Sequence, residues 1–197
     1  VIQEIDPQTS VLFDTGHALS YGPSFLYASS HHVIHSSFFH RMGWSVPGLV
    51  GAKLANPDHP ALAFVGDGSF MMTGAAVATA FEQGLGMGFV VFNNRSLQIE
   101  RELMMKTYGR TALTDYVTMV DGRPWSPDCV AWSRSMGGDG VKVTRPEEIR
   151  EAVRRALTSP GPFIVDVDID PDAPGYRSAP YKYPSSFAER GLAHPPF

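Results

Sequence analysis

The sequence lacks several features that define large classes of proteins. Cys129 is the only cysteine, so no disulfide can form within the chain, which is consistent with a reducing compartment. No apolar run approaches the roughly 18 residues that a transmembrane helix needs. The segment from Val1 to Asp6 has neither the cationic start nor the apolar stretch of a secretion signal. We therefore expect a cytoplasmic protein that does not enter a membrane.

An excess of charge of one sign is also missing. The 16 basic and 20 acidic residues give a formal net charge of −4, and the isoelectric point is about 5.9. This balance gives no basic surface for nucleic acid. The sequence also has no internal repeat, and no Gly-x-Gly-x-x-Gly turn follows a strand-like run, which disfavours a plain doubly wound nucleotide-binding protein. We expect a small-molecule substrate and protein partners, but no nucleic acid.

Two short apolar runs, each ending in polar residues, predict the fold. Residues 61–65 and 88–92 are typical of buried strands, and residues 69–85 between them are typical of a helix. Together they predict a βαβ unit, in which both strands end at the same edge of a parallel sheet. We expect an α/β fold with a doubly wound, mostly parallel sheet and helices on both faces, formed by residues 1–170.

The polar residues after these runs indicate a ligand. Asp67 follows the first run, and Asn94 follows the second at an interval of 27 residues from Asp67. A carboxylate and an amide oxygen at one sheet edge suit Mg²⁺, which binds few protein side chains and several phosphate or water oxygens. Gly68 allows close backbone approach, and Ser69 adds a hydroxyl donor beside the start of a helix, where anions bind. A metal diphosphate is the ligand that this pattern predicts.

At these residues the sequence resembles a known family. The segment Gly66-Asp67-Gly68-Ser69, with Asn93-Asn94 following, is similar to the diphosphate-binding domain of thiamine diphosphate enzymes, in the branch of 2-oxo acid decarboxylases and acetolactate synthases. The segment from Arg41 to Gly51 is similar to a second family segment, and Met42 precedes Asp67 by the family's interval of 25 residues. The resemblance covers roughly residues 11–170 and implies the thiamine diphosphate-binding fold, with thiamine diphosphate and Mg²⁺ as cofactors.

The resemblance assigns roles to the residues of the two turns. It implies that Asp67 and Asn94 bind Mg²⁺ through their side chains, and that Ser96 does so through its backbone carbonyl. The other residues of the first turn would hold the cofactor's diphosphate: Gly66, Gly68 and Ser69.

Residues nearer the N-terminus would contact the rest of the cofactor. Met42 would support its bent conformation and so take part in catalysis, and His40 would offer its backbone carbonyl to the aminopyrimidine. Filling a gap in a core is the alternative role for Met42. Gly16 and His17 follow the strand-like run 11–13 and resemble the family's first loop on the diphosphate. An ordinary loop histidine is the alternative for His17.

Ile99 and Glu100 bear on the reaction. Decarboxylases of the family carry an aliphatic residue and Glu at these two positions, so Ile99 would contact the cofactor and Glu100 would be a catalytic acid. That role needs a carboxyl whose pKa is raised by a partly buried, apolar site. The alternative is a solvated charge on a helix over residues 98–106. Residues 95–98 depart from the decarboxylase pattern, which leaves the substrate open.

Two other clusters invite a metal interpretation. The first consists of His31, His32, His35 and His40, and the second of Asp166, Asp168 and Asp170. A predicted short strand at residues 33–34 interrupts the histidine cluster, and this cluster lacks the Cys or Glu partner of a zinc site. We therefore interpret the histidines as strand residues near the cofactor. The acidic residues alternate along a predicted strand, which favours one face at a sheet edge or strand end.

The remaining elements are predicted as scaffold. We expect a helix over residues 127–136, a strand over 141–143, a helix carrying apolar residues from Ile149 to Leu157, and a strand from Phe163. Thr144 and Glu147 have the spacing of a capping box before the second of these helices.

The family's activating glutamate, which lies on a pyrimidine-binding domain, has no counterpart here. The resemblance therefore implies a partner subunit that supplies this glutamate, in an α2β2 hetero-oligomer. The segment 171–197, rich in Pro and aromatic residues, is expected to pack on that partner. The predicted function is decarboxylation of a 2-oxo acid. The alternatives are an acetolactate synthase-like carboligase subunit and a non-catalytic cofactor-binding regulatory subunit.

Overall fold

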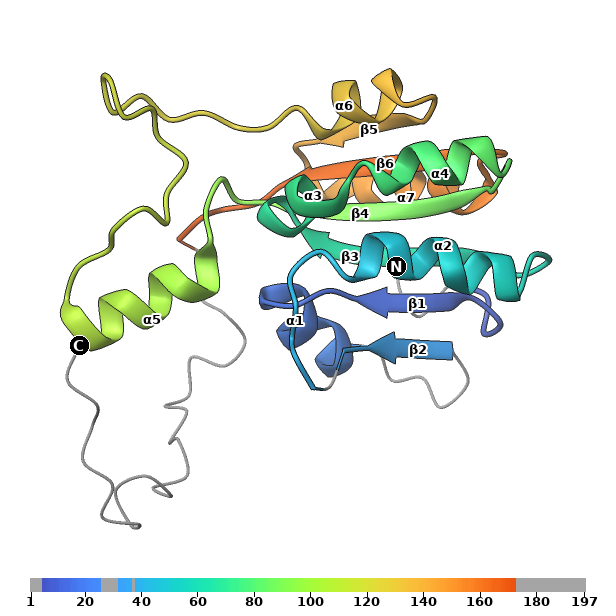
Figure 1. Cartoon of the computed structure of the whole chain (residues 1–197), viewed down its shortest axis with the longest axis horizontal. Helices are drawn as coiled ribbons and strands as arrows, with labels where there is room; N and C mark the ends of the chain where they lie inside the picture. The colour runs from blue at the N-terminus through green and yellow to red at the C-terminus, as the bar shows by residue number, and fades with distance from the viewer. Residues whose placement is uncertain (1–4, 26–31, 37, 173–197) are drawn as a thin grey trace, which may run out of the picture.

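The computed structural model describes residues 5–25, 32–36 and 38–172. Six strands form one sheet in the order β2-β1-β3-β4-β6-β5, and every neighbouring pair is parallel (Figure 1). The strands are β1 (Ser10–Phe13), β2 (His32–His35), β3 (Ala61–Gly66), β4 (Met87–Asn93), β5 (Asp139–Val143) and β6 (Pro162–Asp168).

Helices cover both faces of this sheet. The α-helices are α1 (His17–Phe25), α2 (Ser45–Ala55), α3 (Asp67–Thr73), α4 (Ala76–Glu82), α5 (Gln98–Tyr108), α6 (Cys129–Ser135) and α7 (Ile149–Thr158), and η2 (Pro146–Glu148) is a 3-10 helix. One buried core lies between the sheet and α2, α3, α4 and α6, and a second lies between the sheet and α1 and α7. The predicted α/β fold with helices on both faces is confirmed.

The side chains of the inner strands point alternately to the two faces of the sheet, which explains why there are two cores. In β3, Ala61, Ala63 and Val65 face the first core, whereas Leu62 and Phe64 face the second. Because successive side chains of a strand point to opposite faces, an uninterrupted apolar run serves both layers. The sequence predicted this run as a buried strand for that reason.

The predicted helix over residues 69–85 is divided into α3 and α4. At Gly74 an added Cβ would lie 2.8 Å from the Phe70 carbonyl oxygen and 3.0 Å from the Trp132 ring. Trp132 packs edge-on against Phe70, with 5.5 Å between ring centroids. The absence of a side chain at Gly74 thus lets an aromatic side chain of α6 approach the backbone closely, and a packing requirement of this kind cannot be seen in helical periodicity.

Two local predictions need correction. Glu148, not Glu147, accepts hydrogen bonds from the backbone N–H groups of Thr144 and Arg145, at 3.3 Å each. β6 lies between β4 and β5, so the sheet-edge alternative for the three acidic residues is wrong. The strand-end alternative fits Asp168, which ends β6, and Asp170, which lies just beyond it. Of the C-terminal segment 171–197, only the first two residues are described, and its predicted packing lies otherwise outside the described residues.

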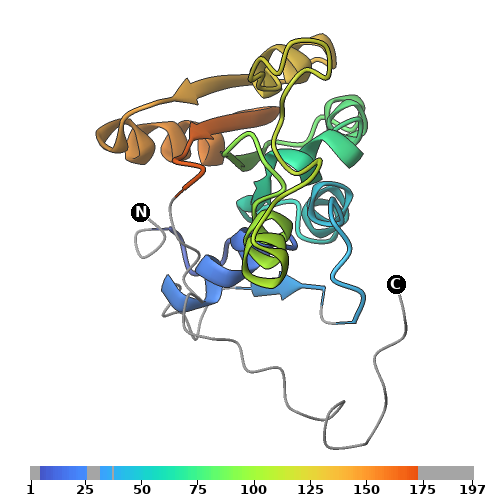
Figure 2. The ribbon, with the colours of Figure 1, turned by 90° about the vertical axis from the view of Figure 1, so that its left-hand side faces the viewer.

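Helix α5 stands apart from the layered body. It lies beyond the carboxyl ends of the strands in Figure 1, and in Figure 2, which views the molecule from that side, it lies in front of the body. Gln98 is the one residue of this helix that is buried. The polar turns after β1, β3 and β4 emerge on the same side. No helix in the described part of the chain is long and apolar enough to span a membrane.

Candidate cofactor site

A cavity of about 250 Å³ lies where β1, β3 and β4 end. Its walls come from the turns after these strands, from the segment before α2 and from the start of α5. It brings together all the residues to which the sequence assigned a role: Gly16, His17, His40, Met42, Gly66, Asp67, Gly68, Ser69, Asn94, Ser96, Ile99 and Glu100.

Asp67 joins the two polar turns. Its side chain accepts hydrogen bonds from the backbone N–H groups of Gly68 and Arg95, each at 2.7 Å. Only 2% of its surface is exposed, and this burial raises its pKa to about 6, against the opposing effect of the two backbone N–H groups. A cation at this carboxylate would favour the charged form and offset the cost of burial.

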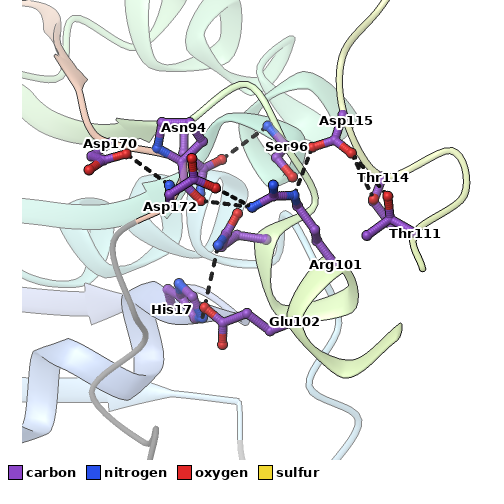
Figure 3. Close-up of polar contacts among 12 residues, drawn as sticks. His17, Asn94, Ser96, Arg101, Glu102, Thr111, Thr114, Asp115, Asp170 and Asp172 are labelled. Carbon is purple, nitrogen blue, oxygen red and sulfur yellow. Dashed lines mark hydrogen bonds and ion pairs between the residues drawn. The ribbon is translucent and has the colours of Figure 1, made fainter. Parts of the chain in front are cut away.

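Asn94 and Ser96 complete the second turn. The Asn94 side-chain oxygen accepts a hydrogen bond from the Ser96 backbone N–H at 3.1 Å, and both residues are buried (Figure 3). Arg95 between them has a φ of 58°, a left-handed conformation that tightens the turn. Ser96 also forms a bridge with Asp115, so the turn is held by the segment that follows α5.

Asp14 is a positioning residue to which the sequence assigned no role. Its carboxylate is fully buried and accepts hydrogen bonds from the backbone N–H groups of Thr15, Gly43 and Ser45, all at 2.9 Å. It therefore ties the end of β1 to the segment that carries Met42. The sequence does contain a signal for this residue, because Asp14 directly follows an apolar strand-like run.

Met42 lies at the cavity rather than in either core. It is half-buried, and its Cε would lie 3.3 Å from a Cβ added to Gly68. The adjoining Gly43 has a φ of +82° and little space for a side chain, because an added Cβ would lie 2.8 Å from Thr73 Oγ1. This tight turn places Met42 beside the first turn of α3.

His17 and residues of α5 meet at the cavity. His17 Nε2 lies 3.4 Å from Glu102 Oε1, and Gln98 Nε2 donates to the same oxygen at 3.4 Å (Figure 3). Arg101 pairs with Asp115 at 3.0 Å. No functional signal in the sequence pointed to these α5 residues beyond their place on a predicted helix, because their partners are distant in the chain.

Ile99 and Glu100 lie at the rim of the cavity. Ile99 is 44% exposed, and Glu100 is also exposed. The partly buried setting expected for Glu100 is therefore absent from the described part of this chain. Another surface would have to cover the carboxyl to raise its pKa.

Buried polar atoms without partners gather around the cavity. Thr15 Oγ1, Ser96 Oγ, Gln98 Oε1 and Tyr116 OH have no hydrogen-bond partner among the described residues. Such atoms cost about 1–3 kcal/mol each unless a ligand or water satisfies them. Hydroxyl donors beside an oxygen-rich pair, Asp67 and Asn94, fit a divalent cation together with a phosphate-bearing ligand.

The other candidate metal clusters gain no support. Within residues 5–25, 32–36 and 38–172, no group of three or more His, Cys, Asp or Glu side chains is placed to hold a metal ion. Asp168 pairs with Arg95 at 2.5 Å, and Asp166 accepts a hydrogen bond from Asn93 at 3.0 Å. His32 and His35 lie on β2 as predicted but do not line the cavity, whereas His40 lines the cavity but does not lie on a strand. His31 lies outside the described residues.

The fold and the cavity together define an α/β domain with a cavity at the carboxyl ends of parallel strands. Residues 14–167 match the family model described as thiamine pyrophosphate enzyme, C-terminal TPP binding domain. The chain therefore belongs to this family, and the resemblance seen in the sequence is confirmed.

Curated relatives agree with this assignment. The chain is 37% identical over 143 residues to the putative thiamine pyrophosphate-containing protein YdaP of Bacillus subtilis, covering 71% of this chain and 23% of that protein. It is 30% identical over 141 residues to the acetolactate synthase isozyme 2 large subunit of Escherichia coli, covering 70% and 24%. It is 25% identical over 186 residues to acetolactate synthase of Bacillus subtilis, covering 94% and 31%. The chain thus spans less than a third of the length of these relatives.

Proposed function

We propose that this chain is the diphosphate-binding part of a thiamine diphosphate- and Mg²⁺-dependent enzyme that decarboxylates a 2-oxo acid. The observation that carries the proposal is Asp67, a buried carboxylate that joins the turns after two neighbouring parallel strands. Family membership supports thiamine diphosphate as the cofactor. The oxygen donors of Asp67 and Asn94 support Mg²⁺ as the metal.

The chain's own residues divide the binding task. Asp67, Asn94 and the Ser96 carbonyl would hold the metal, and Gly66, Gly68 and Ser69 would hold the diphosphate, together with Gly16 and His17, which line the same cavity. Met42 and the His40 carbonyl would orient the cofactor's ring system. When bound, thiamine diphosphate supplies the electron sink that allows CO₂ to leave a 2-oxo acid.

We also propose that a second polypeptide surface completes the site and carries the activating glutamate. Phe38 and Phe39, next to His40, are 93% and 89% exposed, and Ile99 and Leu103 on α5 are about half exposed. Exposed large apolar side chains on the segments that also line a cavity are typical of a surface that a partner covers. Burial of Glu100 by that surface would supply the apolar setting that a catalytic acid needs. An α2β2 hetero-oligomer is the assembly proposed.

A carboligase is the second candidate for the reaction. Two of the relatives described above are named acetolactate synthase proteins, which favours joining of two carbonyl compounds. Ile99 and Glu100 at the cavity rim favour decarboxylation instead. Product analysis with pyruvate and longer 2-oxo acids separates the two, since free aldehyde supports decarboxylation and a 2-hydroxyketone or acetohydroxy acid supports carboligation.

The first experiment measures thiamine diphosphate binding with and without Mg²⁺ by calorimetry. Asp67→Ala should abolish Mg²⁺-dependent binding, whereas Asp58→Ala, an exposed carboxylate between α2 and β3, should leave it unchanged. The same variants are then assayed in the assembled enzyme. Full activity in Asp67→Ala would contradict the catalytic proposal. Binding by the wild-type protein without turnover of any 2-oxo acid would favour the regulatory-subunit alternative.

A further inference from the structure

The hydroxyl of Tyr116 lies directly against Gly68. A Cβ added to Gly68 would lie 2.7 Å from this hydroxyl oxygen, 2.8 Å from Leu97 Cδ2 and 3.3 Å from Met42 Cε. Leu97 and Met42 both line the cavity at the strand ends. The hydroxyl therefore lies on the side of Gly68 that faces these cavity residues.

The Tyr116 side chain is held in place from two directions. Its backbone N–H donates to the Arg95 carbonyl at 2.9 Å, and its own carbonyl accepts from the Trp125 N–H at 3.0 Å. Its ring stacks on the Trp125 ring, with 5.1 Å between centroids and 19° between planes. The position of the hydroxyl is thus fixed before any ligand arrives, which lowers the entropic cost of using it.

This fixed hydroxyl has an unmet hydrogen bond. Its oxygen is buried and has no partner among the described residues. A tyrosine hydroxyl carries one proton, which it can donate in a hydrogen bond. Ser96 Oγ, in the turn after β4, is also buried and has no hydrogen-bond partner among the residues that the structure describes.

The ligand that satisfies such a donor must present acceptors next to Asp67. A free anion would be repelled by the carboxylate, but a diphosphate paired with a divalent cation is attracted to it and carries many acceptor oxygens. We propose that the Tyr116 hydroxyl donates a hydrogen bond to an oxygen of the bound diphosphate. This inference rests on the proposed function and adds a binding residue from the connector between α5 and α6.

The test compares wild type and Tyr116→Phe by calorimetry, using the purified protein with any chain that copurifies. The probes are thiamine diphosphate with Mg²⁺ and inorganic pyrophosphate with Mg²⁺. Loss of one hydrogen bond to a charged oxygen should weaken binding of both probes about ten- to a hundredfold. The melting temperature of the ligand-free protein should stay the same or rise, because the variant removes a buried donor that had no partner. Tyr108→Phe, at an exposed tyrosine of α5, is the matched control and should change neither quantity.

Each result decides between explanations. Equal affinity of wild type and Tyr116→Phe for both probes would overturn this inference and leave the proposed function standing. A lower melting temperature with unchanged affinity would also overturn it, because it would show that the hydroxyl bonds to protein or to a buried water. Failure of the wild-type protein to bind either probe would overturn the proposed function, and this inference with it.

Discussion

At the scale of single residues, the first turn of α3 has no room for a side chain at Gly68. Gly68→Ala would place a methyl group within 3 Å of Tyr116 and Leu97. We expect this change to lower the free energy of unfolding by about 1–3 kcal/mol and to weaken diphosphate binding. Urea unfolding and calorimetry check the two effects.

Gly51→Ala is the matched control, because an added Cβ at this exposed position of α2 meets nothing within 4 Å. Ala is the better helix former, so stability should rise by about 0.5–1 kcal/mol. Adding Tyr116→Phe to Gly68→Ala should recover part of the lost stability. An equal gain in both glycine variants would contradict the crowding seen at Gly68.

The buried carboxyl of Asp166 predicts that the stability of the fold depends on pH. Burial raises its pKa above the ordinary 3.8, although the hydrogen bond from Asn93 opposes the shift. The folded state therefore keeps this proton where the unfolded chain has lost it, so the stability that Asp166 contributes is full below about pH 4 and falls as pH rises through the folded pKa. Asp166→Asn should become more stable relative to wild type as pH rises from about 4 to 8, as measured by urea unfolding.

Asp170→Asn, at an exposed carboxyl just beyond β6, is the control for this series. Its stability should remain within about 0.5 kcal/mol of wild type at each pH, as is usual for surface positions. A constant difference between Asp166→Asn and wild type across the range would contradict the assigned cause.

Residue spacing predicted which turns meet at the cavity, but it did not point to every residue that lies there. The interval from Asp67 to Asn94 was informative because a βαβ unit brings the ends of neighbouring strands together whatever the side chains between them. Tyr116 and Glu102 gave no comparable signal. Their positions depend on where α5 and its connector fold back, which is set by contacts between residues far apart in the sequence.

At the scale of elements, α5 is attached to the body mainly by polar contacts. Arg101 pairs with Asp115 at 3.0 Å and with Asp172 at 2.8 Å, which links the helix to its connector and to the end of β6. Arg101→Ala should speed amide hydrogen exchange in residues 98–125, while the free energy of global unfolding changes by less than about 1 kcal/mol. Hydrogen-exchange mass spectrometry measures the first effect.

Arg154→Ala on α7 removes a solvent-exposed ion pair with Glu151 and serves as the control. Because α7 is anchored by its buried apolar face, exchange in residues 98–125 should be unaffected. Equal exchange in wild type and Arg101→Ala would show that other contacts hold α5. Periodicity predicted α5 and α7 alike, but it could not show that one packs on the sheet and the other stands away from it.

At the scale of the whole molecule, the exposed apolar residues near the cavity predict association. Phe39→Glu places a charge at an almost fully exposed apolar position and should prevent assembly with the partner without lowering the melting temperature. Light scattering on the copurified complex measures the mass. Leu54→Glu on α2, at the other end of the sheet, is the control and should assemble normally; assembly by both variants would place the interface elsewhere.

The strand order has a consequence for synthesis. β6 is the last strand of the sheet to be made, yet it lies between β4 and β5 and pairs with both. Until residue 168 has left the ribosome, β4 has one long edge whose backbone N–H and C=O groups lack strand partners, and β5 has no neighbour in the sheet. Contacts that must wait for β6 slow folding and expose surfaces prone to aggregation, so this order makes the growing polypeptide a natural client for chaperones.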